Sequence, residues 1–137
     1  PHRHIQLLRR DPSELSCPRE RWILDFDNEN YKNQRFYKNI ILKKFSKTLN
    51  KENIHEIYKD LSYKLGLGKP EIDKKPRYPY NLIFTNHWML LIKRKTDNLY
   101  GISVNALGFA GYILVTEKSD INYLKKIGPE KLLENFL

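Results

Sequence analysis

The chain has 137 residues, and 25 lysines and arginines against 16 aspartates and glutamates give it a formal net charge of +9. This is the length of one domain, and with 40% apolar and 12% aromatic residues the chain is not a disordered one. It has no apolar run near 18 residues that could cross a membrane, and no secretory leader pattern. The single cysteine, Cys17, excludes an internal disulfide and a cysteine-rich zinc site, and it favours a reducing, cytoplasmic setting.

The positive charge suits an anionic partner, which could be nucleic acid, a membrane surface or a small polyphosphate. Much of the excess lysine lies in a middle region that is also crowded with Asn, Ile and Tyr, such as residues 31–41. Compositional bias therefore explains the charge better than a nucleic-acid surface does. No zinc-finger spacing, aromatic RNA-binding motif or GxxG clamp supports nucleic-acid binding.

Residues 2–8 are predicted to form the first strand. Side chains alternate across a strand, so His2, His4 and Gln6 share one face. The sequence Asp11-Pro12-Ser13 breaks the strand. Residues 22–24 then form a short apolar anchor or strand.

Two amphipathic helices are predicted in the middle of the chain. The first covers residues 31–49, where apolar side chains recur at three- and four-residue steps. The second covers residues 52–65, and Gly66 or Gly68 ends it. His55 lies beside the apolar stripe of the second helix and is interpreted as an ordinary surface histidine.

The next region is predicted to be a connector followed by a hairpin. Three prolines and several charges make residues 69–80 an exposed connector. Strands are expected at residues 81–86 and 88–94, with a tight turn at Asn86-His87. The second strand is apolar on both faces, which indicates a position inside a sheet that is covered on both sides.

Residues 101–111 contain three glycines among small and large apolar residues, in a chain that has only six glycines. This pattern indicates either a tightly packed bulge or a stretch that lines a ligand. A strand at residues 112–116 follows. Ser119-Asp120 is a plausible N-cap for a helix through Ile127, and residues 130–137 form a terminal helical turn or two.

The motif His2-Arg3-His4-Ile5-Gln6 carries the strongest chemical signal. Two histidines on one strand face could bind a metal ion, but no further ligands stand at a recognisable zinc spacing. The alternative is nucleophilic attack at phosphorus, because a neutral imidazole is mostly unprotonated near pH 7. A neutral amide such as Gln6 could then donate to a phosphate oxygen.

Three segments of the chain, in order, resemble one family. Residues 1–6 resemble the His-x-His-x-Gln motif of the transferase branch of the histidine-triad superfamily. Residues 80–94 and the stretch from Gly101 to Gly111 resemble the C-terminal half of ATP adenylyltransferases, also called diadenosine tetraphosphate phosphorylases. The resemblance covers residues 1–10 and about 78–133.

The resemblance implies phosphorolysis of diadenosine tetraphosphate to ATP and ADP, and the reverse, through an adenylyl-histidine. His4 would be the nucleophile, Gln6 would contact the transferred phosphate and His2 would support the site. Lys93 and Arg94 are candidate contacts for the polyphosphate, and Ser103 and Asn105, which share a face, are candidate lining residues. No cofactor is expected to be required, and whether a divalent metal assists stays open.

Two other readings stay open. One is a nucleotide hydrolase of the same superfamily, in which water replaces phosphate. The other is a basic nucleic-acid-binding module without turnover. A hexose-phosphate uridylyltransferase shares the histidine motif, but residues 101–105 point away from it.

The expected architecture is α+β, with a histidine-triad-like antiparallel sheet and helices packed on it. The chain is expected to be a single unit, residues 1–137, and an incomplete copy of the domain whose N-terminal part precedes Pro1. Nucleotides are the expected partners, with no membrane, together with self-association or pairing with that upstream part.

Overall fold

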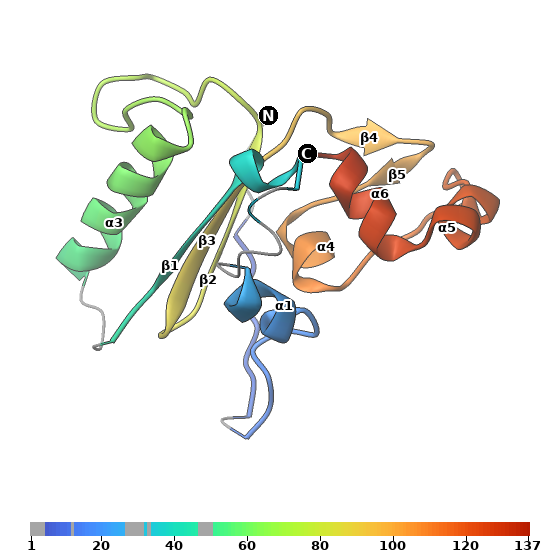
Figure 1. Ribbon diagram of the computed structural model, residues 1–137, viewed down its shortest axis with the longest axis horizontal. Coiled ribbons are helices and arrows are strands. Elements are labelled where there is room, and N and C mark those ends of the chain that lie inside the picture. The colour runs from blue at the N-terminus through green and yellow to red at the C-terminus, as the bar shows by residue number, and fades with distance from the viewer. Residues whose placement is uncertain (1–4, 12, 27–31, 33, 47–50) are drawn as a thin grey trace.

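The computed structural model describes residues 5–11, 13–26, 32, 34–46 and 51–137. It confirms the α+β class: a three-stranded antiparallel sheet lies between one long helix and a group of short helices (Figure 1). The long helix, α3 (Lys51–Lys64), covers one face of the sheet. The C-terminal helices cover the other face.

The sheet has the strand order β1–β3–β2, with β1 at Ile40–Lys44, β2 at Tyr80–Phe84 and β3 at Trp88–Lys93. Both neighbours are antiparallel to β3, and Leu90 pairs with Leu42 on one side and Ile83 on the other. The predicted hairpin is confirmed. Its turn closes where the Thr85 amide donates to the Trp88 carbonyl at 2.9 Å.

The central strand β3 joins two hydrophobic cores, because its side chains alternate between the two faces of the sheet. Trp88, Leu90 and Ile92 face the core under the C-terminal helices. Met89 and Leu91 face the core under α3, where they meet residues such as Leu61. Each of these five side chains is almost fully buried, which confirms the prediction of a strand covered on both sides.

The helix predicted at residues 52–65 is confirmed as α3. Leu61 and Leu65 are buried on its apolar side, while His55 is exposed. Gly66 follows with φ of 73°, and the Leu67 amide donates to the Ser62 carbonyl, so a left-handed glycine ends the helix as expected. Residues 69–79 form the predicted exposed connector without regular structure.

The C-terminal part begins with a small hairpin, β4 (Asn98–Leu99) and β5 (Ile102–Ser103). Three short helices follow: α4 (Ala106–Ala110), α5 (Ile121–Ile127) and α6 (Pro129–Asn135). The predicted Asp120 cap is confirmed, because its carboxylate accepts from the Tyr123 amide at 2.8 Å. The terminal helical turns predicted after Gly128-Pro129 are confirmed as α6.

The N-terminal part carries α1 (Glu20–Asp25), where the sequence suggested an apolar anchor or a strand. Its Ile23 is fully buried in the core under the C-terminal helices. A single 3₁₀ turn, η1 (Tyr37–Asn39), leads into β1. The Asn39 side-chain amide donates to the carbonyl of Leu137, so the end of the described chain is held against the start of β1.

The helix predicted at residues 31–49 is wrong, because its described part contains η1 and β1 instead. Three consecutive apolar residues, Ile40 to Leu42, suit a strand that is covered on both faces better than a helix with one apolar face. Ile40 and Leu42 face the core under the C-terminal helices, and Ile41 faces the core under α3. Pairing with β3 therefore decides the structure of this segment.

The strand predicted at residues 112–116 is also wrong, since the segment has no strand partner among the described residues. Its two ends bond elsewhere: the Tyr112 amide donates to the Leu107 carbonyl in α4, and the Thr116 amide donates to the Ser119 hydroxyl. Of the strand predicted at residues 2–8, residues 5–8 are not in a strand, and residues 2–4 lie outside the described residues.

Candidate functional site

Arg94, the residue after β3, is one of the candidate phosphate contacts predicted from the sequence. Its Nη1 donates to the Val104 carbonyl at 2.8 Å, and its Nη2 lies 2.9 Å from the Asp97 carboxylate. The side chain is only 13% exposed, and its Nε is buried without a partner among the described residues. Burial lowers the pKa of the Arg94 guanidinium, and the negative charge of Asp97 opposes this shift. Arg94 therefore ties β3 to the glycine-rich stretch.

Asn105 is the N-cap of α4, because its side-chain oxygen accepts from the Gly108 amide at 3.2 Å. Gly108 is required there: a Cβ would lie 2.6 Å from a Val104 methyl group. The sequence of residues 101–111 indicates either a tightly packed bulge or a stretch that lines a ligand. The packing of Gly108 against Val104 confirms tight packing around Asn105 and Gly108. Asn105 is exposed, but its side chain is committed to the helix start.

Ser103 belongs to the same cluster as Arg94, whereas Lys93 pairs with Tyr80 in the sheet and lies on the face that α3 covers. The Ser103 hydroxyl donates to the Asp97 carbonyl at 3.0 Å. The Lys93 ammonium lies 5.1 Å from the centre of the Tyr78 ring, a cation–π contact that leaves its donors free to bind an anion. The structure therefore brings three of the candidate residues together. Asp97 contacts both Arg94 and Ser103. Arg94 also donates to the carbonyl of Val104, the residue before Asn105.

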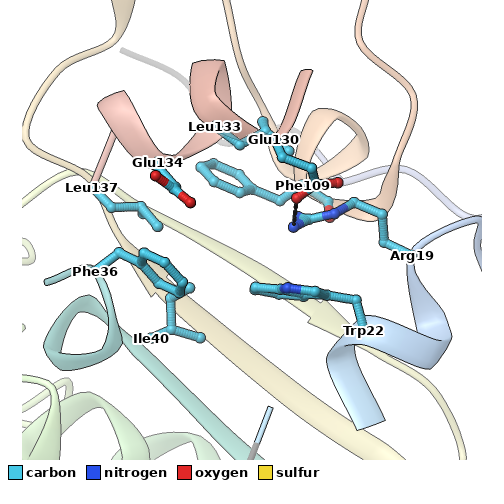
Figure 2. Close-up of a pocket in the computed structure, with 9 residues that line it drawn as sticks. All are labelled: Arg19, Trp22, Phe36, Ile40, Phe109, Glu130, Leu133, Glu134 and Leu137. Carbon is cyan, nitrogen blue, oxygen red and sulfur yellow. Dashed lines mark hydrogen bonds and ion pairs between the residues drawn. The ribbon is translucent and has the colours of Figure 1, made fainter. Parts of the chain in front are cut away.

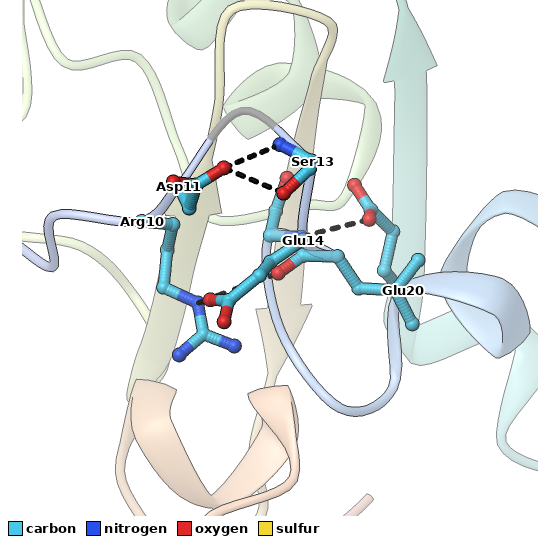
Figure 3. Close-up of polar contacts among 7 residues, drawn as sticks. Arg10, Asp11, Ser13, Glu14 and Glu20 are labelled. Atoms are coloured by element: carbon cyan, nitrogen blue, oxygen red, sulfur yellow. Dashed lines mark hydrogen bonds and ion pairs between the residues drawn. The ribbon is translucent and has the colours of Figure 1, made fainter.

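His2 and His4 lie outside the described residues, and Gln6 is in an exposed segment. The chain continues through residues 10–11 and 13–20, called the N-terminal turn below, whose polar contacts Figure 3 shows. The Arg10 Nε lies 3.7 Å from a carboxylate oxygen of Glu14. The Asp11 carboxylate accepts hydrogen bonds from both the backbone amide and the hydroxyl of Ser13. The described part of the chain shows no hydrogen bond that joins Gln6 to the cluster around Arg94.

Glu20 holds this turn on the sheet. One carboxylate oxygen accepts from the Ser16 amide at 2.8 Å, and the other accepts from the Trp88 indole at 3.1 Å. Burial alone would raise the pKa of Glu20, but the hydrogen bonds from Ser16 and Trp88 outweigh it and hold the pKa below its ordinary value. Glu20 could not be recognised from the sequence, because nothing local marks a carboxylate that accepts from a residue 68 positions away.

Arg19 is the second residue that sequence reasoning missed. Its guanidinium lies over the Trp22 ring, donates to the Phe109 carbonyl and pairs with Glu130 at 2.6 Å (Figure 2). Its backbone amide donates to the Ala110 carbonyl. These contacts join the N-terminal turn to the end of α4 and the start of α6.

A small cavity of about 20 Å³ lies beside Arg19. Its walls are mainly apolar, as Figure 2 shows, with Trp22, Phe36 and Phe109 among them and Glu134 at the rim. It is smaller than the pockets that usually enclose a whole nucleotide-sized ligand. None of the residues predicted from the sequence lines it.

Other residues weighed in the sequence analysis have simple roles. His55 and His87 are exposed, on α3 and in the β2–β3 turn. Cys17 is buried, and burial raises the pKa of its thiol. Trp88 is a core residue, as expected. Within the described ranges, no three His, Cys, Asp or Glu side chains lie close enough to hold a metal ion.

The fold by itself gives the class of protein. It is an α+β domain, and its antiparallel sheet is consistent with part of a histidine-triad-like domain. A family model described as the ATP adenylyltransferase C-terminal domain matches residues 27–136. The chain therefore belongs to this family, which makes it a nucleotidyltransferase of the adenylyl-transferring kind. No curated protein and no solved structure shows a significant match.

The family match confirms the resemblance, and it extends over the middle of the chain as well as residues 80–111. The motif from His2 to Gln6 lies before the matched residues. Among the described residues, none of the helices is long and apolar enough to serve as a membrane span.

Proposed function

We propose that this chain carries part of the site of an enzyme that cleaves diadenosine tetraphosphate with inorganic phosphate, giving ATP and ADP, and that also runs in reverse. The observation that carries the proposal is the family match over residues 27–136, together with the histidine motif that precedes it in the chain. Adenylyl transfer belongs to the family, whereas the dinucleotide substrate and the phosphate acceptor are the proposal.

His4 is the proposed nucleophile. Its neutral imidazole attacks the phosphorus of one adenylyl group, a P–N bond forms, and the bond to the bridging oxygen breaks so that ATP leaves. An oxygen of inorganic phosphate then attacks the adenylyl-histidine, and ADP leaves as the imidazole is restored. Gln6 donates to an oxygen of the transferred phosphate, and His2 supports the site.

The four other residues are proposed to have two kinds of role. The Lys93 ammonium lies over the Tyr78 ring and keeps its donors, so Lys93 is the proposed contact for the phosphate chain. The Ser103 hydroxyl is already donated to the Asp97 carbonyl, so Ser103 is proposed to hold the hairpin beside Arg94. Arg94 and Asn105 are already committed to Val104, Asp97 and α4, so they are proposed to hold the glycine-rich stretch in place. The net charge of +9 is consistent with an anionic substrate.

Covalent labelling tests the proposal directly. The chain is mixed with diadenosine tetraphosphate that carries a labelled adenylyl phosphorus, and acid-labile label on the protein is counted. We expect His4→Ala to abolish labelling and His55→Ala, an exposed histidine on α3, to leave it intact. Labelling that persists without His4 would contradict the assignment of the nucleophile.

The acceptor is tested by the products. Formation of ADP that depends on added phosphate supports the phosphorylase. Release of AMP at the same rate without phosphate would instead indicate the superfamily's hydrolases. Binding of DNA or RNA with a steep salt dependence, and no nucleotide turnover, would indicate the basic binding module.

A further inference from the structure

Tyr100 occupies a backbone conformation that a tyrosine seldom adopts. It is the one non-glycine residue with a positive φ in the part of the chain that the structure describes, at 52°. It lies at the tip of the β4–β5 hairpin, and Gly101 beside it has φ of 75°. Two central residues with positive φ are typical of a type I′ turn, in which Asn and Gly are preferred. A bulky residue there costs stability, and such strain is a reason to look for a function.

Hydrogen bonds to the backbone of Tyr100 and Gly101 hold the hairpin turn in this strained conformation. The Asp120 amide donates to the Tyr100 carbonyl at 2.9 Å, and the Ser119 hydroxyl donates to the Gly101 carbonyl at 3.2 Å. A Cβ on Gly101 would lie 1.8 Å from the Lys118 carbonyl. The hairpin tip therefore lies directly against the start of α5, on the side of the molecule away from α3 (Figure 1).

The Tyr100 ring packs against the Tyr123 ring, with the two ring planes tilted by 32°. Its centre lies 3.9 Å from that of Tyr123, and the Tyr123 hydroxyl accepts from the Asn135 amide of α6 at 3.2 Å. The Tyr123 ring is thus fixed, and Tyr100 is still 57% exposed. Because Tyr100 contacts Tyr123 and is still largely exposed, part of its ring remains accessible to a further aromatic ring.

We propose that Tyr100 is a stacking platform for the purine base of the nucleotide substrate. Aromatic side chains bind bases through their faces, and a flat ring held at a rigid tip loses little freedom on binding. The same hairpin ends at Ser103 and begins beside Asp97, which pairs with Arg94, the residue next to the proposed phosphate contact Lys93. Lys118, exposed beneath the turn, adds positive charge on that side. This inference rests on the proposed function.

The test separates strain from binding by using Tyr100→Asn. Asparagine tolerates positive φ, so the variant is expected to unfold at a higher urea concentration than the wild type. Because it cannot stack, its dissociation constant for ATP is expected to rise about tenfold. Its dissociation constant for inorganic tripolyphosphate, which has no base, stays unchanged. Calorimetric titration of the whole chain gives both constants.

Two further variants are controls. Tyr100→Phe keeps the ring and is expected to bind ATP as the wild type does. Tyr63→Asn removes a comparably exposed tyrosine from α3, and ATP binding should not change.

Three results would overturn the inference. The first is that Tyr100→Asn binds ATP with wild-type affinity. The second is that ATP and tripolyphosphate weaken equally, which would mean that the turn shapes a phosphate site. The third is binding of single-stranded oligoadenylate but not of ATP. A wild-type chain that binds ATP through Tyr100 but shows no labelling at His4 would leave the platform standing and overturn the proposed mechanism instead.

Discussion

At the scale of single residues, the charged side chains that matter most are those that bond distant parts of the chain. The Glu20 carboxylate accepts hydrogen bonds from the Ser16 amide and the Trp88 indole. Arg19 joins Phe109 and Glu130, and Arg94 joins Val104 and Asp97. Each of these three side chains is partly buried and bonds two separate partners, which makes its loss more costly than that of an exposed ion pair.

Glu20→Gln tests this directly. Gln has one acceptor oxygen where Glu20 has two, so either Ser16 or Trp88 loses its acceptor. We expect the free energy of unfolding at pH 7 to fall by about 1.5 kcal/mol.

The pH dependence of this difference has a definite sign. Because the pKa of Glu20 is lowered in the fold, its contribution is present above its unfolded pKa, about 4.5, and is lost as the pH falls through the folded value. Urea denaturation of both proteins from pH 7 down to pH 3 should therefore show the two stabilities converging in acid. A constant difference would contradict the role of the charge.

At the scale of elements, left-handed glycines decide where the chain turns, but they differ in what surrounds them. Gly66 ends α3 with nothing within 4 Å of the place that a Cβ would take, whereas Gly101 faces the Lys118 carbonyl. Gly111, with φ of 113°, ends α4 against Pro18 of the N-terminal turn. The glycine-rich stretch is thus required for close backbone approach as well as for its turns.

Alanine substitutions at Gly66 and Gly101 form a matched pair. Both must adopt positive φ, which costs about 1 kcal/mol. Only Gly101→Ala also places a methyl group 1.8 Å from a backbone oxygen, so we expect it to lose about 3 kcal/mol or more. Urea midpoints measure both. Equal losses would show that the hairpin can move away from α5 at little cost.

At the scale of the whole molecule, the N-terminal segment leaves its apolar side chains uncovered. Ile5 is 86% exposed and Leu7 is 90% exposed, while both faces of β3 are buried. Exposed apolar groups next to one another mark a surface that another chain can cover. This is consistent with the expected self-association, or with pairing of this segment with another part of the enzyme.

Sedimentation velocity over a range of concentrations tests self-association. We expect the chain to sediment as more than a monomer, and the double variant Ile5→Ser/Leu7→Ser to shift it towards the monomer. Ile72→Ser in the connector, an isoleucine that is 71% exposed, is the control and should change nothing. A wild-type chain that is monomeric at every concentration would contradict the prediction.

Prediction from the sequence succeeded where the local pattern of turn, capping and apolar residues matches the pattern of buried side chains in the fold. The helix at residues 52–65, the hairpin around Asn86-His87 and the Asp120 cap each depend on neighbouring residues, and all three are confirmed. It failed at residues 40–44 and 112–116, because an apolar segment becomes a strand only when a partner strand is available. Of the candidate site, the structure places Arg94, Ser103 and Asn105 near one another, whereas the roles of all seven candidate residues stay predictions.

The sequence by itself determined the α+β class and the family, because these depend on composition, short motifs and local turn chemistry. The residues proposed to carry the chemistry stay predictions. Only the tertiary structure decided which side chains are committed to packing and which are free. Contacts between residues far apart in the chain fix the positions of Glu20, Arg19 and the ring pair Tyr100–Tyr123. No local pattern encodes such contacts, because burial and partners exist only once the sheet and its two covering layers are assembled.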